Sequence, residues 1–374
     1  MHVVISAVNR FTRPSGLCRF TANLARSLAT AHAVKQVTII VGAWQVDHFR
    51  HCFGLEGDKI IVSVSDCDNN TRSRYLWYYF GLPQLLRILR PDLLQLAFPM
   101  PFLRSRIDVP IVTTVHDLYS FDVPQTIGFP NILLNRYVLG RAVEDSTAVV
   151  SISRFTESRL RAHLGRKLDS ARARVIYQCV LKPKSGVTDR RIIDHPYFLS
   201  VAQHWKHKNL DIVIAAMHRL LQHGAIGPQT SLVIVGAEGP STAHLLSMVS
   251  ALEMEDRVNF LYSVTDSELA LLYANSEALI VASSIEGFCL PVVEARFCGA
   301  RVICSDIPVL REIGDASTRF FRLSSNAVTE LAFAMERALQ QPKPCSTVFQ
   351  QRFSMTQCRD NYVQLYEELL LIRP

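Results

Sequence analysis

The sequence has no long hydrophobic run and no leader pattern. Its most apolar stretch, residues 82–103, is interrupted by Arg87 and Asp92, so it lacks the roughly 18 uninterrupted apolar residues that a membrane span requires. The apolar run at residues 3–8 is too short for the hydrophobic region of a signal peptide. We therefore expect a cytoplasmic protein without a membrane-spanning segment.

Cysteine pairs and the common nucleotide and metal motifs are also missing. The nine cysteines are an odd number without a C-x-x-C pair, which argues against a disulfide framework and a structural zinc site and favours a reducing compartment. No G-x-G-x-x-G follows a strand, and neither G-x-x-x-x-G-K-[S/T] nor H-E-x-x-H occurs. We therefore expect no metal site, and neither a dinucleotide-binding loop nor a kinase-type phosphate-binding loop.

The composition is that of a globular protein, but its charge is divided unevenly. Apolar residues make up 49% and charged residues 20%, so the chain can form hydrophobic cores, and its 374 residues suffice for about two domains. Residues 1–195 carry 26 Lys and Arg against 15 Asp and Glu, whereas residues 196–374 carry 14 against 18. Charge alone leaves nucleic acid, anionic lipid and phosphorylated small molecules open as partners of the basic half.

Short runs rich in β-branched residues alternate with segments of helical spacing in both halves of the chain. Such alternation is typical of doubly wound parallel sheets, so we expect two α/β domains. In the first half the expected strands are residues 3–8, 36–41, 59–64, 92–97, 110–115, 148–152 and 174–177, and the expected helices are 20–28, 75–89, 132–143 and 155–164. In the second half the expected strands are 198–202, 231–235, 258–262, 278–282 and 301–304, and the expected helices are 210–221, 242–252, 266–274 and 291–298.

A polar stretch separates the two alternating regions. Residues 183–195 lose the hydrophobic pattern and contain proline and glycine, which indicates a linker. We expect a first domain at residues 1–182, a second at residues 196–354 and a C-terminal helix at residues 355–374. Because open α/β sheets bind ligands at the carboxyl ends of their strands, we expect the active site in a cleft between the domains.

The strongest local signal is residues 283–295, SSIEGFCLPVVEA, which end one expected strand and begin a helix. Two carboxylates, Glu286 and Glu294, lie eight residues apart there. Gly287 lets the backbone turn toward a ligand, Pro291 suits the first helical turn, and the N–H groups of a helix start favour an anion such as a diphosphate. The alternative, two exposed or capping acids on an ordinary turn, is less consistent with the whole segment.

Residues 258–317 closely resemble the C-terminal domain of the retaining glycosyltransferase family 4, within the glycosyl transferases of group 1, and Glu286 and Glu294 match its Glu-x7-Glu motif. Further matches are Ser15-Gly16 with the family's glycine loop, His116-Asp117 with its His-Asp strand end, Ser151 to Phe155 with its Ser-x-Phe-Ser helix start, and residues 201–209 with the segment of its phosphate-binding lysine. The resemblance implies the GT-B fold, two Rossmann-like domains facing a central cleft. It also implies hexosyl transfer from a nucleotide sugar, with retention and without a metal ion or other cofactor.

The resemblance assigns roles to the matching residues. His116, Glu286 and Lys208 are the expected catalytic residues: the first two would contact the donor hexose, and the lysine would offset the charge of the leaving diphosphate. Glu294 would hold the ribose hydroxyls. The expected donor-binding residues are Gly16, Gln203, Lys208, Gly236, Tyr262, Ser263, Gly287, Phe288, Cys289, Leu290 and Glu294, with Asp117 on the acceptor side. His116 could instead be a hydrogen-bonded residue that only ends a strand.

Three positions depart from the family pattern. Gln203 stands where an arginine commonly contacts phosphate, and Lys206 or His204 could replace that contact. Ser263 and Cys289 stand where the family has glycine, and both changes narrow the pocket.

The resemblance is greatest to bacterial mannosyl- and rhamnosyltransferases of surface polysaccharide and lipopolysaccharide synthesis. We therefore expect transfer of mannose or a deoxyhexose, with a GDP-linked donor favoured, to a glycan or lipid-linked oligosaccharide, and no nucleic-acid partner. Three alternatives remain open: a hydrolase with paired carboxylates, a non-catalytic nucleotide-sugar sensor or scaffold, and a sugar-nucleotide epimerase.

Two basic segments could bring the enzyme to the inner face of an anionic membrane. Residues 72–80 mix arginines with aromatics, continue to Arg87 and Arg90, and fit either an interfacial helix or a core-packing helix with a solvated arginine face. The second segment contains Arg154, Arg159, Arg161, Arg166 and Lys167 and fits a lipid contact or a solvated face equally well.

Overall fold

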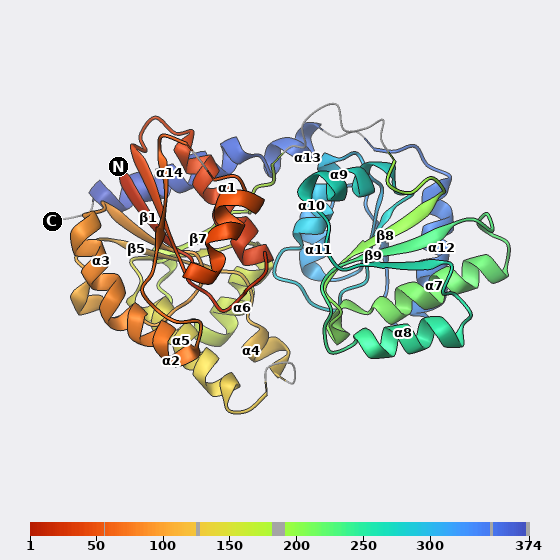
Figure 1. Ribbon diagram of the computed structural model, residues 1–374, viewed down its shortest axis with the longest axis horizontal. Coiled ribbons are helices and arrows are strands. Elements are labelled where there is room, and N and C mark those ends of the chain that lie inside the picture. Colours follow the sequence, from red (N-terminus) through yellow and green to blue (C-terminus); the bar gives the residue numbers. More distant parts are fainter. Residues whose placement is uncertain (56, 125–127, 182–190, 345–346, 372–374) are drawn as a thin grey trace. The chain divides into compact units, whose positions relative to one another are not determined.

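The computed structural model describes residues 1–55, 57–124, 128–181, 191–344 and 347–371, and it divides into two compact units (Figure 1). Unit 1 comprises Met1–Cys179 and Phe353–Pro374, and unit 2 comprises Val180–Arg352. The chain therefore returns to unit 1 at its end. Residues 183–190 of the expected linker lie outside the described residues.

Unit 1 is built on a sheet of seven parallel strands in the order β3-β2-β1-β4-β5-β6-β7, counted over the residues described. The strands are β1 (His2–Ser6), β2 (Gln36–Val41), β3 (Ile60–Val64), β4 (Leu93–Leu96), β5 (Ile111–Val115), β6 (Ala148–Ser151) and β7 (Ala173–Val175). The helices are α1 (Gly16–Ala29), α2 (Thr71–Leu76), α3 (Leu82–Leu89), α4 (Tyr119–Asp122), α5 (Asn131–Asp145), α6 (Arg154–Leu164) and α14 (Met355–Leu371). The strand order reverses between β1 and β4, so the loops after these two strands adjoin.

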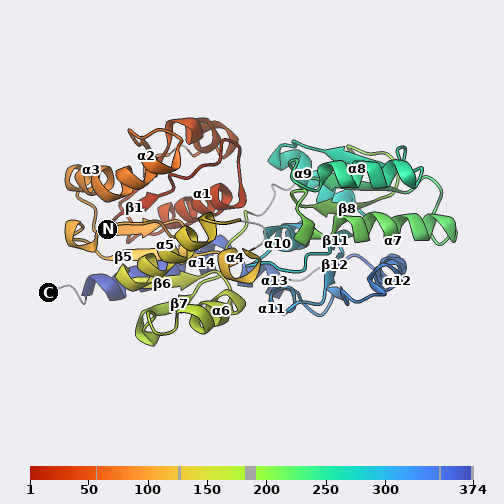
Figure 2. The same ribbon diagram turned by 90° about the horizontal axis from the view of Figure 1, so that it is seen from below.

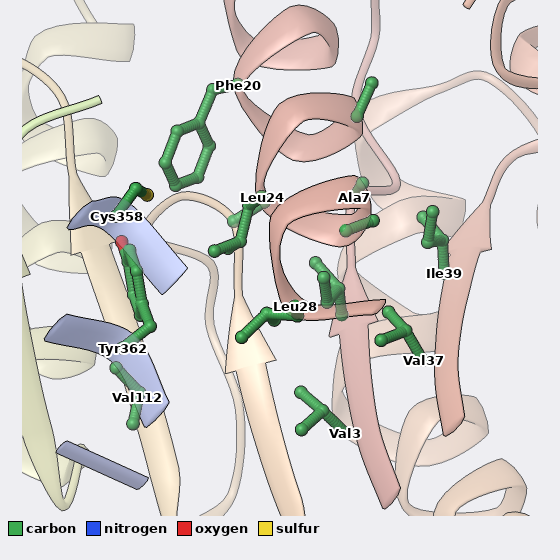
Figure 3. Close-up of a cluster of buried hydrophobic side chains, with 14 of the residues drawn as sticks. Val3, Ala7, Phe20, Leu24, Leu28, Val37, Ile39, Val112, Cys358 and Tyr362 are labelled. Carbon is green, nitrogen blue, oxygen red and sulfur yellow. The ribbon is translucent and has the colours of Figure 1, made fainter. Parts of the chain in front are cut away.

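Alternate residues of the strands enter two cores, one on each face of the sheet. On one face, Val3 and Ile5 pack with Leu24 of α1 and Tyr362 of α14 (Figure 3). On the other face, Val4 packs with the residues of α3 and of the π-helical turn η3 (Trp77–Gly81) that precedes it. The two faces thus follow the twofold alternation of a strand.

Helix α14 is an integral part of unit 1. Ser27 Oγ donates to the carbonyl oxygen of Met355 over 2.7 Å, and the Tyr366 hydroxyl donates to Gln95 Oε1 over 2.8 Å. Tyr362 and Tyr366 are fully buried. The expected C-terminal helix therefore completes the core of the unit that contains the N-terminus.

Unit 2 repeats the architecture with six parallel strands, again among the described residues, in the order β10-β9-β8-β11-β12-β13. The strands are β8 (Tyr197–Val201), β9 (Ser231–Val235), β10 (Val258–Leu261), β11 (Leu279–Val281), β12 (Val302–Ser305) and β13 (Arg319–Phe321). The helices are α7 (Leu210–Gln222), α8 (Thr242–Ala251), α9 (Asp266–Asn275), α10 (Leu290–Phe297), α11 (Pro308–Ile313), α12 (Ala327–Leu339) and α13 (Thr347–Arg352). Figure 2 shows helices on both faces of this sheet.

The predicted fold class of two doubly wound α/β domains is confirmed, with local differences. Helices α4 and α11 to α13 were not predicted. Strand β13 was not predicted either, because a three-residue edge strand has too little alternation to stand out. The helix predicted to begin at residue 75 begins at Thr71, where the Asn70 side chain caps it. In the part of the chain that is described, no helix is both long and apolar enough to cross a membrane.

Candidate active site

A lysine and a carboxylate meet where the strand order of unit 2 reverses. Strands β8 and β11 are neighbours, so the loops that follow them adjoin at the carboxyl edge of the sheet. Lys208, in the first loop, places Nζ 2.5 Å from Oε1 of Glu286, in the second, and both side chains are largely buried. Ser283 Oγ donates to the same oxygen over 2.7 Å. Glu286 Oε2 has no polar partner among the described residues, so it can still accept a ligand hydroxyl.

Further hydrogen bonds join the same two loops. Asn209 Nδ2 donates to the carbonyl oxygen of Ala282 over 2.7 Å, and the Ser284 amide donates to the carbonyl oxygen of His207 over 2.9 Å. Asn209 has a φ of 49°, a left-handed conformation that asparagine tolerates better than most residues. The loops therefore hold Lys208 and Glu286 in a fixed relation.

The second carboxylate of the motif has a different partner. Glu294 lies in α10, and its Oε2 accepts a hydrogen bond of 3.0 Å from the hydroxyl of Tyr273, a residue of α9 that is 1% exposed. A buried tyrosine on a neighbouring helix thus orients this carboxylate. The prediction of α9 was correct, but nothing in the sequence indicated that its tyrosine would contact Glu294, because helical spacing does not specify which helices pack together.

The loop before α10 contains the expected diphosphate-binding backbone. Gly287 and Phe288 are buried, and Leu290 begins α10. Cys289 has a φ of 84°, in the left-handed region that favours glycine. The backbone conformation is therefore a physical reason for the glycine that the family pattern has at this position. Burial and the nearby Glu286 raise the pKa of the Cys289 thiol well above its ordinary value, so the thiol is protonated at neutral pH.

Two residues near the end of β8, His204 and Lys206, were considered as replacements for the phosphate-binding arginine that is Gln203 in this chain. Gln203 is exposed, and its Oε1 accepts a hydrogen bond from Trp205 Nε1 at 3.2 Å. His204 is fully buried, its Nδ1 lies 2.9 Å from Thr242 Oγ1, and burial lowers its pKa. The buried ring of His204 gives no support to a phosphate contact by this residue. Lys206 is exposed and remains a candidate.

The other expected donor residues of unit 2 divide into exposed and structural positions. Tyr262 is 40% exposed and Ser263 is exposed, both just after β10. At Gly236, a Cβ atom would lie 2.0 Å from the carbonyl oxygen of Ala202. This glycine is therefore required by the close approach of two strand ends, with no ligand needed to explain it.

In unit 1, His116 follows β5 and is held by both ring nitrogens. Its Nε2 lies 2.8 Å from the carbonyl oxygen of Ala97, so this nitrogen carries the proton, and Nδ1 accepts from Gln178 Nε2 at 3.3 Å. Burial lowers the pKa of His116 to about 4, so the ring is neutral at pH 7. Both nitrogens are thus occupied, and the ring is better suited to contact than to proton transfer. Gln178, its positioning partner, was not predicted.

Two further expected residues of unit 1 lie at the ends of strands or the starts of helices. Asp117 is exposed, and its Oδ1 accepts from the Tyr119 amide at 3.1 Å. Gly16 is the first residue of α1, which Ser15 caps, and a Cβ atom at Gly16 would meet no atom within 4 Å. Neither conformation nor packing requires a glycine there, so the space beside it is open to a ligand.

The site gives no support to a hydrolase with paired carboxylates. Such catalysis places two carboxyl groups on either side of one bond. Here Glu286 is held by Lys208 and Ser283, whereas Glu294 is held by Tyr273. Among the described residues there is also no group of three or more His, Cys, Asp or Glu side chains that could hold a metal ion.

Comparison with known proteins decides the family. The profile described as Glycosyltransferase Family 4 matches residues 14–180, and that described as Glycosyl transferases group 1 matches residues 190–352. The O-antigen chain mannosyltransferase RfbU of Salmonella typhimurium is 30% identical over 257 residues, which are 67% of this chain and 67% of that protein. The chain belongs to the group 1 glycosyltransferases.

A further sequence relative and two solved structures are also similar to this glycosyltransferase. The O-antigen chain mannosyltransferase B of Escherichia coli is 23% identical, over 81% of this chain and 82% of that one. The solved sucrose-phosphate synthase of Thermosynechococcus elongatus has a TM-score of 0.75 at 17% identity, with 99% of both chains covered. WaaG, a glycosyltransferase of lipopolysaccharide biosynthesis, has a TM-score of 0.66 at 16% identity, also with 99% of both chains covered. These structural matches confirm the GT-B fold of the glycosyltransferase.

Proposed function

We propose that this glycosyltransferase transfers mannose, or a closely related hexose, from a GDP-linked donor to a glycan or lipid-linked oligosaccharide of a surface polysaccharide such as an O-antigen. Two mannosyltransferase relatives of O-antigen synthesis support the hexose and the acceptor class. The observation that carries the proposal is the Lys208–Glu286 pair at the strand-order reversal of unit 2.

The pair can serve a leaving diphosphate and a hexose at the same time. The Lys208 ammonium has three protons, and the single contact with Glu286 leaves others for phosphate oxygens. The negative charge on the diphosphate grows as the glycosidic bond breaks, so a fixed cation and the start of α10 stabilise the transition state more than the ground state. Glu286 Oε2 can accept a hydroxyl of the hexose, and Glu294 can accept the ribose hydroxyls.

We propose that the reaction proceeds with retention and without a metal ion. Retention rests on the family resemblance. Metal independence rests on Lys208, because an ammonium group in a largely buried setting can offset the charge that a divalent cation offsets in other transferases. The neutral His116 contacts the sugar without exchanging a proton.

A panel of nucleotide sugars tests this function directly. We expect slow hydrolysis of GDP-mannose to GDP in the absence of acceptor, at rates above those with UDP- or dTDP-linked hexoses, and unchanged in excess EDTA. The measurement is release of nucleoside diphosphate, together with donor binding by calorimetry. Binding of a donor without turnover, even with added lipid-linked acceptors, would favour a sensor, and activity that EDTA abolishes and Mg²⁺ or Mn²⁺ restores would contradict the metal-free site.

Replacing Gly16 tests the part that unit 1 takes in donor binding. We expect Gly16→Ala to leave the melting temperature unchanged or slightly raised, because alanine suits a helix better than glycine. Donor hydrolysis should fall by up to about a hundredfold, since displacing a bound phosphate by about 1 Å can cost that much. Gly57→Ala is the matched control, because a Cβ atom at Gly57 also meets no atom within 4 Å and this residue precedes β3 rather than following a strand. Equal activity of the two variants would remove Gly16 from the donor site.

A further inference from the structure

The helical segment formed by α2, η3 and α3 buries one stripe and exposes another. Its buried stripe includes Trp77, Tyr78, Leu82 and Leu86, which pack on the sheet of unit 1. Trp77 is 5% exposed, so it is a core residue and cannot contact a membrane. The exposed stripe, termed here the outer arginine face, consists of Arg72, Leu76, Phe80, Arg87, Ile88 and Arg90. The segment lies at the periphery of unit 1 in both views (Figures 1 and 2).

The π-helical turn keeps the outer arginine face in line. Residues spaced by four drift by about 40° at each step of a regular α-helix, because four residues exceed one turn of 3.6. Phe80 follows Leu76 by four residues and lies within the wider turn η3 (Trp77–Gly81), which takes up part of this drift. Leu76, Phe80 and Ile88 are exposed by 48%, 45% and 77%, and the arginines of the face are exposed as well.

A second segment extends this surface. Arg106 places its guanidinium carbon 4.7 Å from the centre of the Phe80 ring, so residues 103–106 adjoin the helix. Leu103 is 37% exposed, and Arg104 and Arg106 are exposed. The continuous surface thus alternates guanidinium groups with large apolar side chains.

The arginines of this surface differ from other basic residues of unit 1 in their ion pairs. Within the described residues, none of Arg72, Arg87, Arg90, Arg104 and Arg106 has a carboxylate partner. The basic segment at residues 154–167 differs, because its Arg159, Arg161 and Lys167 are paired with Asp122, Glu157 and Glu144. The outer arginine face is therefore a better candidate for an external anion than the segment that the charge pattern also suggested.

We propose that the outer arginine face and residues 103–106 dock the glycosyltransferase on an anionic phospholipid surface. Apolar side chains between arginines suit a bilayer interface, where the apolar groups enter the acyl boundary and the guanidinium groups remain among lipid phosphates. Each arginine near such a surface contributes an attraction that salt screens. The inference rests on the proposed function, because a lipid-linked acceptor would be held in a membrane. The evidence for the docking surface itself is the composition of the outer arginine face.

Co-sedimentation with vesicles tests the docking surface. The parent protein should bind phosphatidylcholine vesicles that contain phosphatidylglycerol, should bind pure phosphatidylcholine weakly, and should be released by high salt. The Arg72→Gln, Arg87→Gln, Arg90→Gln triple variant should bind about a hundredfold more weakly, at about fivefold per arginine. The Leu76→Ser, Phe80→Ser, Ile88→Ser variant should also lose binding, but through lost apolar contact.

A variant of equal charge change controls for net charge. Arg219, Arg322 and Arg337 are exposed residues of unit 2, so their triple replacement by glutamine removes the same charge from elsewhere and should leave vesicle binding nearly unchanged. All variants should hydrolyse donor in solution like the parent, which separates this proposal from the proposed function. Three results would overturn the proposal. They are no binding of the parent protein to the anionic vesicles, an equal loss of vesicle binding in both arginine variants, and binding of the outer arginine face to an acidic protein but not to vesicles.

Discussion

A Lys208→Met variant is expected to lose on the order of a hundred- to a thousandfold in kcat, the range seen when one donor to a developing anion is removed. Methionine keeps most of the length of the side chain, one atom shorter than lysine, but supplies no charge and no proton. The Michaelis constant for the donor should change much less, because the interaction strengthens as the diphosphate leaves. Steady-state donor hydrolysis with kcat and KM determined separately is the measurement.

The same substitution also removes the partner of Glu286, so stability needs its own control. A largely buried carboxylate without its counter-ion is destabilising, at about 3 kcal/mol or more. The double variant Lys208→Met, Glu286→Gln removes this buried charge and should recover most of the melting temperature without recovering turnover. If turnover returns together with stability, Lys208 is a structural residue only. If Lys208→Met alters KM alone, Lys208 does not stabilise the transition state.

A Glu294→Gln variant is expected to bind the nucleoside diphosphate about ten- to a hundredfold more weakly. Hydrogen bonds to a charged group contribute about 1.5–3 kcal/mol, and the amide loses both the charge and one acceptor. Tyr273→Phe, which keeps the carboxylate but removes its 3.0 Å hydrogen bond, should have the same effect to a smaller degree. Calorimetric titration with GDP measures both variants.

A nucleotide without ribose hydroxyls makes the test specific. The parent should bind the 2′,3′-dideoxy nucleotide more weakly than GDP, whereas Glu294→Gln should bind the two nearly alike, because the group that distinguishes them is gone. Retained discrimination in this variant would show that Glu294 does not contact the ribose. Equal loss of affinity for both nucleotides would indicate a distorted α10 rather than a lost ribose contact.

Local sequence patterns predicted most of the helices and strands but not the contacts between their side chains. The strand at residues 231–235 was predicted with the bounds that the structure shows, because its apolar run is continuous, follows Thr230 and ends before Gly236. Strand β13 escaped prediction because it is short and begins with a half-exposed arginine. The aromatics at 77–80 could not be divided into core and surface from the sequence, because the π-helical turn that changes their phase has no reliable sequence signal.

The amino-acid sequence by itself determined the two doubly wound units and the motif residues Glu286 and Glu294, since hydrophobic periodicity and motif spacing are local properties of the chain. Only the tertiary structure decided that Lys208 meets Glu286 across 78 residues, because that contact requires β8 and β11 to be neighbours in the sheet. The orientation of Glu294 by Tyr273 likewise depends on how α9 packs beside α10. Strand order and helix packing arise from the burial of whole faces, which no single segment specifies.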